Sequence, residues 1–130
     1  MALDTNVLVR FLVEDDAEQT ARAAALLGRA ERDGEPLLVS EVVPCELVWV
    51  LESAYGFARA EIAGALRDLL AVRALRYLRL DALQRALAAY SSGRGDFADY
   101  VVREVARDAG CKAVATFHRA ILKEPGFVEP

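Results

Sequence analysis

Five side chains able to bind a metal ion are distributed along this chain so that folding could gather them. Four are acids and one is the only histidine: Asp4, Glu46, Asp96, Asp99 and His118. Carboxylate oxygens are the ligands that Mg²⁺ and Mn²⁺ prefer in proteins. Acids that meet at one point repel one another, and a divalent cation offsets that repulsion. These residue types therefore predict a metal site, provided that the fold brings them to one place.

The elements that must position these residues are short apolar runs separated by segments of helical length. Strands are predicted at the opening, at 37–39, 75–80, 111–115 and 126–128, and helices at 7–12, 17–33, 40–54, 58–71, 81–92 and 96–109. This alternation favours an α/β fold with a short parallel central sheet covered by helices in three layers, α/β/α. Residues that follow parallel strands meet at one edge of such a sheet, where ligands bind.

Composition predicts a single soluble domain over residues 1–130 and limits how the protein could hold a polyanion. The chain is 55% hydrophobic and carries a net charge of −4. A nucleic-acid binder with a broad basic surface would be more basic, so any such contact must be local. Cys45 and Cys111 stand in apolar contexts and are expected to be free, buried thiols of a reducing compartment. No apolar run reaches the roughly 20 residues of a membrane span, so we expect a cytoplasmic protein.

Asp4 has two interpretations. Aspartate is a common N-cap, and Asp4 stands directly before a helix. An acid in an otherwise apolar opening is, however, a costly choice for a cap alone, and Asn6 could orient it as an outer partner of a metal ligand.

The other acids also have ordinary structural explanations. Glu46 would be favoured near a helix N-terminus by the helix dipole, and the spacing alone makes that explanation the stronger one. Asp96 and Asp99 fit an N-cap and the third helical position, and Asp99 could pair with Arg103. Alternatively, Asp99 lies at the border of an apolar stripe formed by Ala98, Val102 and Ala106 and points into a cleft.

Four segments together resemble the PIN-domain family, and most nearly its VapC-like toxins from toxin–antitoxin pairs. They are Leu3-Asp4-Thr5-Asn6-Val7-Leu8-Val9-Arg10, Glu46-Leu47-Val48-Trp49-Val50-Leu51, Asp96-Phe97-Ala98-Asp99-Tyr100 and Thr116-Phe117-His118-Arg119. The opening segment is the most specific, and the later ones gain weight from their order and spacing. The similarity covers essentially the whole chain.

The resemblance implies a metal-dependent endoribonuclease that uses Mg²⁺ or Mn²⁺ and cleaves single-stranded RNA. It assigns the family's acids to Asp4, Glu46 and Asp99, with Asp96 as a neighbouring acid. It also implies supporting roles for three small polar residues: Thr5, Asn6 and Thr116. The implied partners are a second copy of the chain, forming a homodimer, and a small antitoxin whose tail lies across the site.

One position departs from the family pattern. Relatives carry an aspartate where this chain has His118, and imidazole is a poor ligand for Mg²⁺ but acceptable to Mn²⁺. His118 could also carry a proton, or simply be a loop residue facing solvent. With one carboxylate fewer, we expect a one-metal resting site to which Asp96 contributes.

Metal held by Asp4 and Asp99 would lower the pKa of a bound water, with Glu46 completing the site or orienting that water. Arg10, Arg119 and Lys123 are candidate phosphate contacts, although each could equally be a solvated charge. Two rival functions remain open: an RNA- or antitoxin-binding module weakened in cleavage by His118, and a DNA-directed nuclease.

Overall fold

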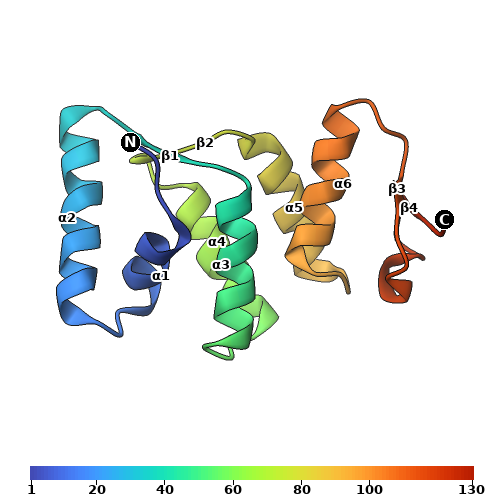
Figure 1. Cartoon of the computed structure of the whole chain (residues 1–130), viewed down its shortest axis with the longest axis horizontal. Coiled ribbons are helices and arrows are strands. Elements are labelled where there is room, and N and C mark those ends of the chain that lie inside the picture. Colours follow the sequence, from blue (N-terminus) through green and yellow to red (C-terminus); the bar gives the residue numbers. More distant parts are fainter. The chain divides into compact units, whose positions relative to one another are not determined.

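The computed structural model describes residues 1–130 and contains six α-helices, one short 3-10 helix and four short strands (Figure 1). The residues group into two compact units, Met1–Leu78 and Arg79–Pro130, and each is described by itself. No helix combines the length and apolar character that crossing a membrane requires.

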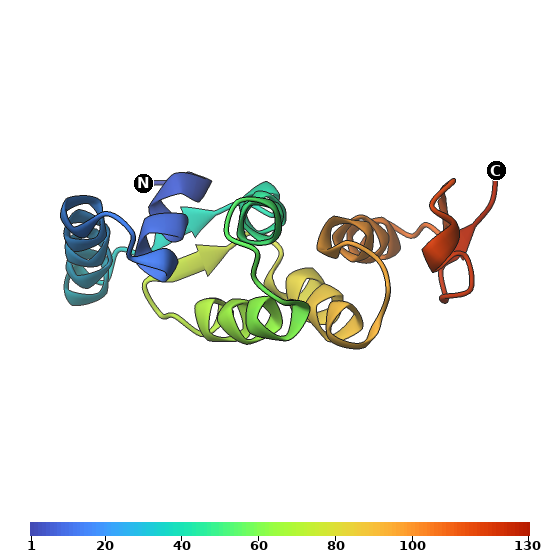
Figure 2. The same ribbon diagram turned by 90° about the horizontal axis from the view of Figure 1, so that it is seen from below.

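The first unit alternates helix and strand. Its elements are α1 (Thr5–Val13), α2 (Ala17–Asp33), β1 (Leu37–Val39), α3 (Val42–Ser53), α4 (Arg59–Leu70) and β2 (Leu75–Tyr77). Strands β1 and β2 pair in parallel, as predicted, with Leu38 opposite Arg76. Ala2 forms an isolated parallel bridge to Leu38, so the strand predicted at the opening is reduced to a single bridge beside β1. Helix α2 lies beside α1 in both views (Figures 1 and 2).

Local signals explain where the helices of this unit begin and end. Asp16 caps α2, because its side chain accepts a hydrogen bond of 2.9 Å from the Gln19 N–H group. Gly34 ends α2 with a φ of 67°, a left-handed conformation that glycine adopts without strain. Pro44 lies in the first turn of α3, where its missing N–H group costs no helical hydrogen bond. The predicted helix over 17–33 is confirmed, because a cap and a stop signal lie at its two ends.

The core of the first unit is aliphatic. Side chains from α1, β1, α3 and α4 are fully buried there: Leu8, Val39, Leu47, Leu51, Ile62, Leu66 and Leu69. Along β2, Leu75 and Tyr77 are buried and Arg76 is exposed, so one side of the strand faces solvent. The predicted span of 75–80 is too long, because the strand ends at Tyr77 and a helix begins at Leu80.

The second unit contains two helices followed by two short strands with a 3-10 helix between them. Its elements are α5 (Leu80–Ser92), α6 (Phe97–Asp108), β3 (Val114–Ala115), η1 (Arg119–Ile121) and β4 (Phe127–Val128). Helices α5 and α6 pack side by side (Figures 1 and 2). Strands β3 and β4 pair in parallel, with Val114 opposite Phe127. The core here is aromatic, with the rings of Tyr90 and Phe97 edge to face at 5.8 Å.

A buried acid joins the two helices of this unit. Glu104 on α6 is 3% exposed. Its Oε2 atom accepts a hydrogen bond of 2.8 Å from the Arg85 guanidinium on α5, and its Oε1 atom accepts one of 3.2 Å from Arg103. Burial would raise the pKa of Glu104, but these hydrogen bonds and positive charges outweigh it, so its pKa lies below the ordinary value.

The prediction that Cys111 is a buried strand residue is wrong. Gly110 has a φ of 88° and ends α6 in a left-handed turn. In that turn the N–H group of Gly110 donates to the Arg107 carbonyl and the N–H group of Cys111 donates to the Ala106 carbonyl. Cys111 therefore belongs to the turn that closes the helix and is exposed, and the strand begins later, at Val114.

The other thiol agrees better with expectation. Both cysteines are free, and Cys45 is half-buried on α3. Burial, with smaller contributions from the carboxylates of Glu41 and Glu46, raises the pKa of Cys45 to about 11. This thiol therefore stays protonated at neutral pH.

The apolar stripe predicted for α6 is also wrong. Ala98 and Val102 are exposed, and Ala106 is only half-buried. The face of α6 that is buried in the structure carries larger side chains instead: Phe97, Tyr100, Val101 and Glu104. These side chains bury more surface than two alanines and a valine could, so the helix turns this face inward.

Candidate functional site

Asp4 stands at the N-cap position of α1 but does not act as a cap. Its backbone is extended, with φ −87° and ψ 157°, and its side chain makes no capping hydrogen bond. Instead, Asn6 Nδ2 donates to Asp4 Oδ2 over 3.2 Å. The carboxylate is exposed, with its Oδ1 atom free to bind a ligand. Of the two interpretations of Asp4, the structure supports the one in which Asn6 orients it.

Glu46 on α3 is held by a buried hydroxyl group. Thr5 is 4% exposed, and its Oγ1 atom donates to Glu46 Oε2 over 2.9 Å. The two residues are far apart in sequence, and this bond joins the start of α1 to the first turns of α3. Trp49, one turn further along α3, is 68% exposed. Glu46 is thus an exposed carboxylate with one oxygen oriented by the fold.

The bond from Thr5 predicts a loss of function without unfolding. In Thr5→Val the shape is kept but the donor to Glu46 is lost. If Glu46 is a metal ligand of a ribonuclease, as the family resemblance implies, we expect RNA cleavage to slow by roughly 10–100-fold, as for other outer partners of metal ligands. Single-turnover cleavage measures this effect. Thr20→Val is the matched control, because the Thr20 hydroxyl donates to the Arg10 carbonyl and touches no acid. Equal rates for the two variants would contradict the role given to Thr5.

In the second unit, Asp96, Asp99 and His118 form a cluster of possible metal ligands. One ligand atom from each residue lies within 4.8 Å of those from the other two. Asp99 Oδ2 is 3.1 Å from His118 Nδ1 and also accepts a hydrogen bond of 2.9 Å from the Asp96 N–H group. The N–H group of His118 donates to Thr116 Oγ1 over 3.0 Å, which fixes the loop that carries the imidazole.

This cluster fits a divalent cation by its donor chemistry. Two carboxylates and an imidazole are a mixed oxygen and nitrogen set, which suits Mn²⁺ better than Mg²⁺. Asp96 is exposed and Asp99 is half-buried, so both carboxylates can be reached by an ion. Asp99 also has the helix-capping role that its position suggested, since it accepts the Asp96 N–H. The expected pairing of Asp99 with Arg103 is absent, because Arg103 binds Glu104 and the Pro125 carbonyl.

The sequence predicted that His118 and Asp99 lie in one group of possible ligands, but it did not specify their direct contact. The two residues are 19 positions apart and lie in different elements. No local pattern marks such a pair, and only the order of the four motifs hinted that the segments meet. The structure places Asp4, Thr5, Asn6 and Glu46 together in the first unit, and Asp96, Asp99, Thr116 and His118 together in the second. That all of them serve one metal site stays a prediction.

The arginines predicted to contact phosphate differ in whether their guanidinium groups already have partners in the structure. The guanidinium of Arg10 donates to Asp15 and to Gln19, each over 2.6 Å. Its hydrogen bond with Asp15 raises the pKa of Arg10, and hydrogen bonds from Tyr55 and Arg10 lower the pKa of Asp15. Arg119, at the start of η1, is exposed and makes no ion pair. Arg10 therefore already has partners within its own unit, whereas Arg119 is available.

Comparison with known proteins adds a family match to this geometry. Residues 1–126 match the PIN domain family. The chain is also 30% identical over 125 residues to a VapC ribonuclease from Aquifex aeolicus (strain VF5), an alignment that covers 96% of this chain and 91% of that protein. The family match agrees with the helices and short parallel strands of the structure and confirms the predicted three-layer α/β/α fold class.

Proposed function

The chain belongs to the PIN-domain family, and from this premise we propose that it is a metal-dependent endoribonuclease that hydrolyses RNA phosphodiester bonds. The observation that carries the proposal is the cluster of Asp96, Asp99 and His118, whose ligand atoms converge within 4.8 Å. In the first unit, Asp4 and Glu46 add two carboxylates, each oriented by a polar neighbour. Acids held in this way, rather than paired with arginines, are suited to metal binding.

We assign the metal ligands to Asp4, Glu46 and Asp99, with help from Asp96. When bound, Mg²⁺ or Mn²⁺ would polarise the phosphate and supply a hydroxide from water at neutral pH. Thr5 and Asn6 keep one oxygen of Glu46 and of Asp4 in place, which leaves the other oxygen of each for the ligand. The Thr116 hydroxyl accepts a hydrogen bond from the His118 N–H group, which helps to keep the imidazole ring within hydrogen-bond distance of Asp99.

We further propose the biological setting that the VapC relative suggests. The chain would be the toxin of a type II toxin–antitoxin pair, active in the cytoplasm, working as a homodimer and inhibited by a cognate antitoxin. Apolar surface on α3 and α6, at Val42, Trp49 and Val102, is exposed and available to such protein partners.

The test is cleavage of a single-stranded RNA oligonucleotide by the purified chain. We expect cleavage with Mn²⁺ or Mg²⁺ and none in excess EDTA. A DNA oligonucleotide of the same sequence, assayed in parallel, distinguishes a ribonuclease from a DNA-directed nuclease. Absence of RNA cleavage with every divalent ion tried would refute the proposed activity.

A second function is favoured by one observation. Because His118 already occupies Asp99 Oδ2, and imidazole adds no negative charge, the cluster binds Mg²⁺ more weakly than three carboxylates would. A PIN fold with so weak a site would act mainly by binding RNA or its antitoxin. Tight RNA binding without cleavage would support this alternative.

His118→Asp separates the two functions. The substitution restores a third carboxylate beside Asp96 and Asp99, so we expect tighter Mg²⁺ binding, by about tenfold or more. Calorimetric titration with Mg²⁺ and with Mn²⁺ gives both affinities, and cleavage assays run alongside. His118→Asn is the control, because it removes the imidazole without adding charge.

If wild type cleaves with Mn²⁺ but needs the His118→Asp change to cleave with Mg²⁺, the enzyme assignment stands. If only His118→Asp cleaves at all, the binding module is correct.

A further inference from the structure

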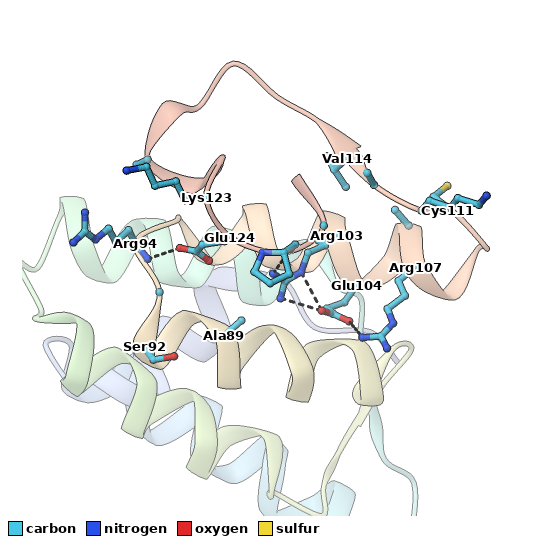
Figure 3. A pocket seen from close by; sticks show the side chains of 17 residues that line it. Ala89, Ser92, Arg94, Arg103, Glu104, Arg107, Cys111, Val114, Lys123 and Glu124 are labelled. Atoms are coloured by element: carbon cyan, nitrogen blue, oxygen red, sulfur yellow. Dashed lines mark hydrogen bonds and ion pairs between the residues drawn. The ribbon is translucent and has the colours of Figure 1, made fainter. Parts of the chain in front are cut away.

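A basic pocket opens in the second unit, next to the elements that carry the metal-ligand cluster. It has a volume of about 940 Å³ and lies between α5, α6 and the C-terminal segment (Figure 3). Five of the residues that line it are basic and two are acidic: Arg94, Arg103, Arg107, Lys112 and Lys123, with Glu104 and Glu124. In a chain of net charge −4, this is a local concentration of positive charge.

Four of the five basic residues of this pocket fall into two groups; the fifth, Lys112, stands beside Cys111. Arg103 and Arg107 lie 3.1 Å and 3.9 Å from the buried carboxylate of Glu104, so both already form ion pairs within the protein. Arg94 and Lys123 make no side-chain hydrogen bond or ion pair in the structure. Figure 3 shows both of them at the same end of the pocket, on the same side of Glu124 and directed away from it. Two unpaired cations therefore share one end of the pocket.

The position of Arg94 is enforced by its neighbours. It stands between Gly93 and Gly95, and a Cβ atom at Gly95 would come within 2.7 Å of Ile121 Cγ2. A Cβ atom at Gly93 would overlap the Tyr100 hydroxyl and lie 2.8 Å from the Ala89 carbonyl oxygen. Neither position can carry a side chain unless the core shifts. The loop can thus pack tightly against Tyr100 and Ile121 while Arg94 alone projects from it.

A second set of contacts ties this loop to the segment that carries Lys123. The N–H group of Arg94 donates to Glu124 Oε1 over 3.0 Å, and the Tyr100 hydroxyl donates to the same atom over 3.0 Å. The carboxylate of Glu124 is therefore held by the loop and by α6. Arg94 is close to the metal-ligand cluster, because two peptide links keep its Cα atom within about 7.6 Å of that of Asp96. Lys123 follows His118 by five positions.

We infer that Arg94 and Lys123 bind the phosphates of the RNA strand beside the Asp96, Asp99 and His118 cluster. Guanidinium binds a phosphate with two parallel hydrogen bonds, and ammonium binds it as a point charge. Because neither cation is paired, binding a phosphate breaks no existing ion pair. The inference rests on the proposed ribonuclease function for the identity of its substrate, but binding of RNA phosphates by Arg94 and Lys123 needs no metal.

The test is RNA binding measured without divalent metal. A fluorescent single-stranded RNA oligonucleotide is titrated by anisotropy in EDTA, at several salt concentrations, against Arg94→Gln, Lys123→Gln and the double variant. Each phosphate contact on a single strand contributes about 0.7 to the slope of log affinity against log salt. We expect each single variant to lower the slope by about 0.7, and the double variant to bind roughly tenfold more weakly.

Two control substitutions match the loss of charge. Arg67→Gln alters an exposed arginine of α4, and Lys112→Gln alters the lysine beside Cys111 in the same pocket. Both should keep the wild-type slope. A DNA strand of the same sequence should lose affinity in the Arg94 and Lys123 variants by the same factor, because phosphate contacts do not read the 2′-hydroxyl. Unchanged circular dichroism spectra show that the variants fold.

The possible results separate this inference from the proposed function. If RNA is cleaved but the Arg94 and Lys123 variants bind it with wild-type slopes, the inference is overturned while the function stands. If the slopes fall as expected but no metal supports cleavage, the binding residues are correct and the nuclease assignment fails. A loss confined to RNA, with DNA binding unchanged, would also overturn the assignment to phosphates.

Discussion

Asp4→Asn is expected to abolish metal-dependent RNA cleavage while leaving the protein folded. The change keeps the size of the side chain and removes only its charge, so the cation loses a ligand that asparagine replaces poorly. The loss should exceed the roughly 10–100-fold typical of outer partners such as Thr5. Asp4 is exposed and makes no capping bond, so stability should change little.

Single-turnover cleavage of RNA, with thermal unfolding run in parallel, measures both effects. Asp68→Asn is the matched control, because Asp68 is an exposed acid of α4 remote in sequence from every proposed ligand. Both variants lose one negative charge, so a general electrostatic effect would slow them alike. Cleavage by Asp4→Asn at the wild-type rate would remove Asp4 from the metal site.

Glu104→Gln should destabilise the protein by about 3 kcal/mol, because it removes the buried carboxylate that pairs with Arg85 and Arg103 and leaves both guanidinium groups without this partner. Arg85 and Arg103 both donate to this carboxylate, and its side chain is only 4% exposed. Asp108→Asn is the control, since Asp108 also pairs with Arg85, over 2.6 Å, but is 41% exposed. A surface pair of that kind contributes about 0–1 kcal/mol. Urea unfolding at neutral pH gives both values, and equal losses would contradict the role given to Glu104.

The pH dependence of this effect has a definite sign. The pKa of Glu104 is lower in the folded protein than its ordinary value of 4.5. The unfolded chain therefore binds a proton more readily, and the contribution of Glu104 is complete above pH 4.5 and is lost as the pH falls through the folded pKa. The stability difference between wild type and Glu104→Gln should accordingly narrow in acid.

Local signals made most of the fold predictable. Helix α2 begins at its Asp16 cap and ends at Gly34, as expected, because both signals act within one turn of the helix. Cys111 shows the limit of such reasoning. Gly110 marks the end of α6, but whether the next residue closes the turn or begins a strand depends on hydrogen bonds that the composition does not encode.

In the candidate site too, contacts between residues close in sequence were predictable, and contacts between distant residues were not. Asp4 and Asn6 are two residues apart, and their contact was predictable from spacing alone. The bond between Thr5 and Glu46 spans 41 positions, and that between Asp99 and His118 spans 19. Family resemblance could name these residues, but only packing determines which polar atoms meet. Glu104 was missed altogether, because nothing in the sequence distinguishes a buried glutamate from the solvated acids around it.

Trp49 provides a built-in optical reporter on the candidate site. It is the only tryptophan of the chain, it is 68% exposed, and it stands one turn after Glu46 on the same side of α3. Its indole emission therefore comes from a single known place and responds to whatever approaches that side of the helix. A nucleobase that stacked on the ring would quench it. Quenching on addition of RNA would therefore show, with the unmodified protein, that the strand reaches the side of α3 that carries Glu46.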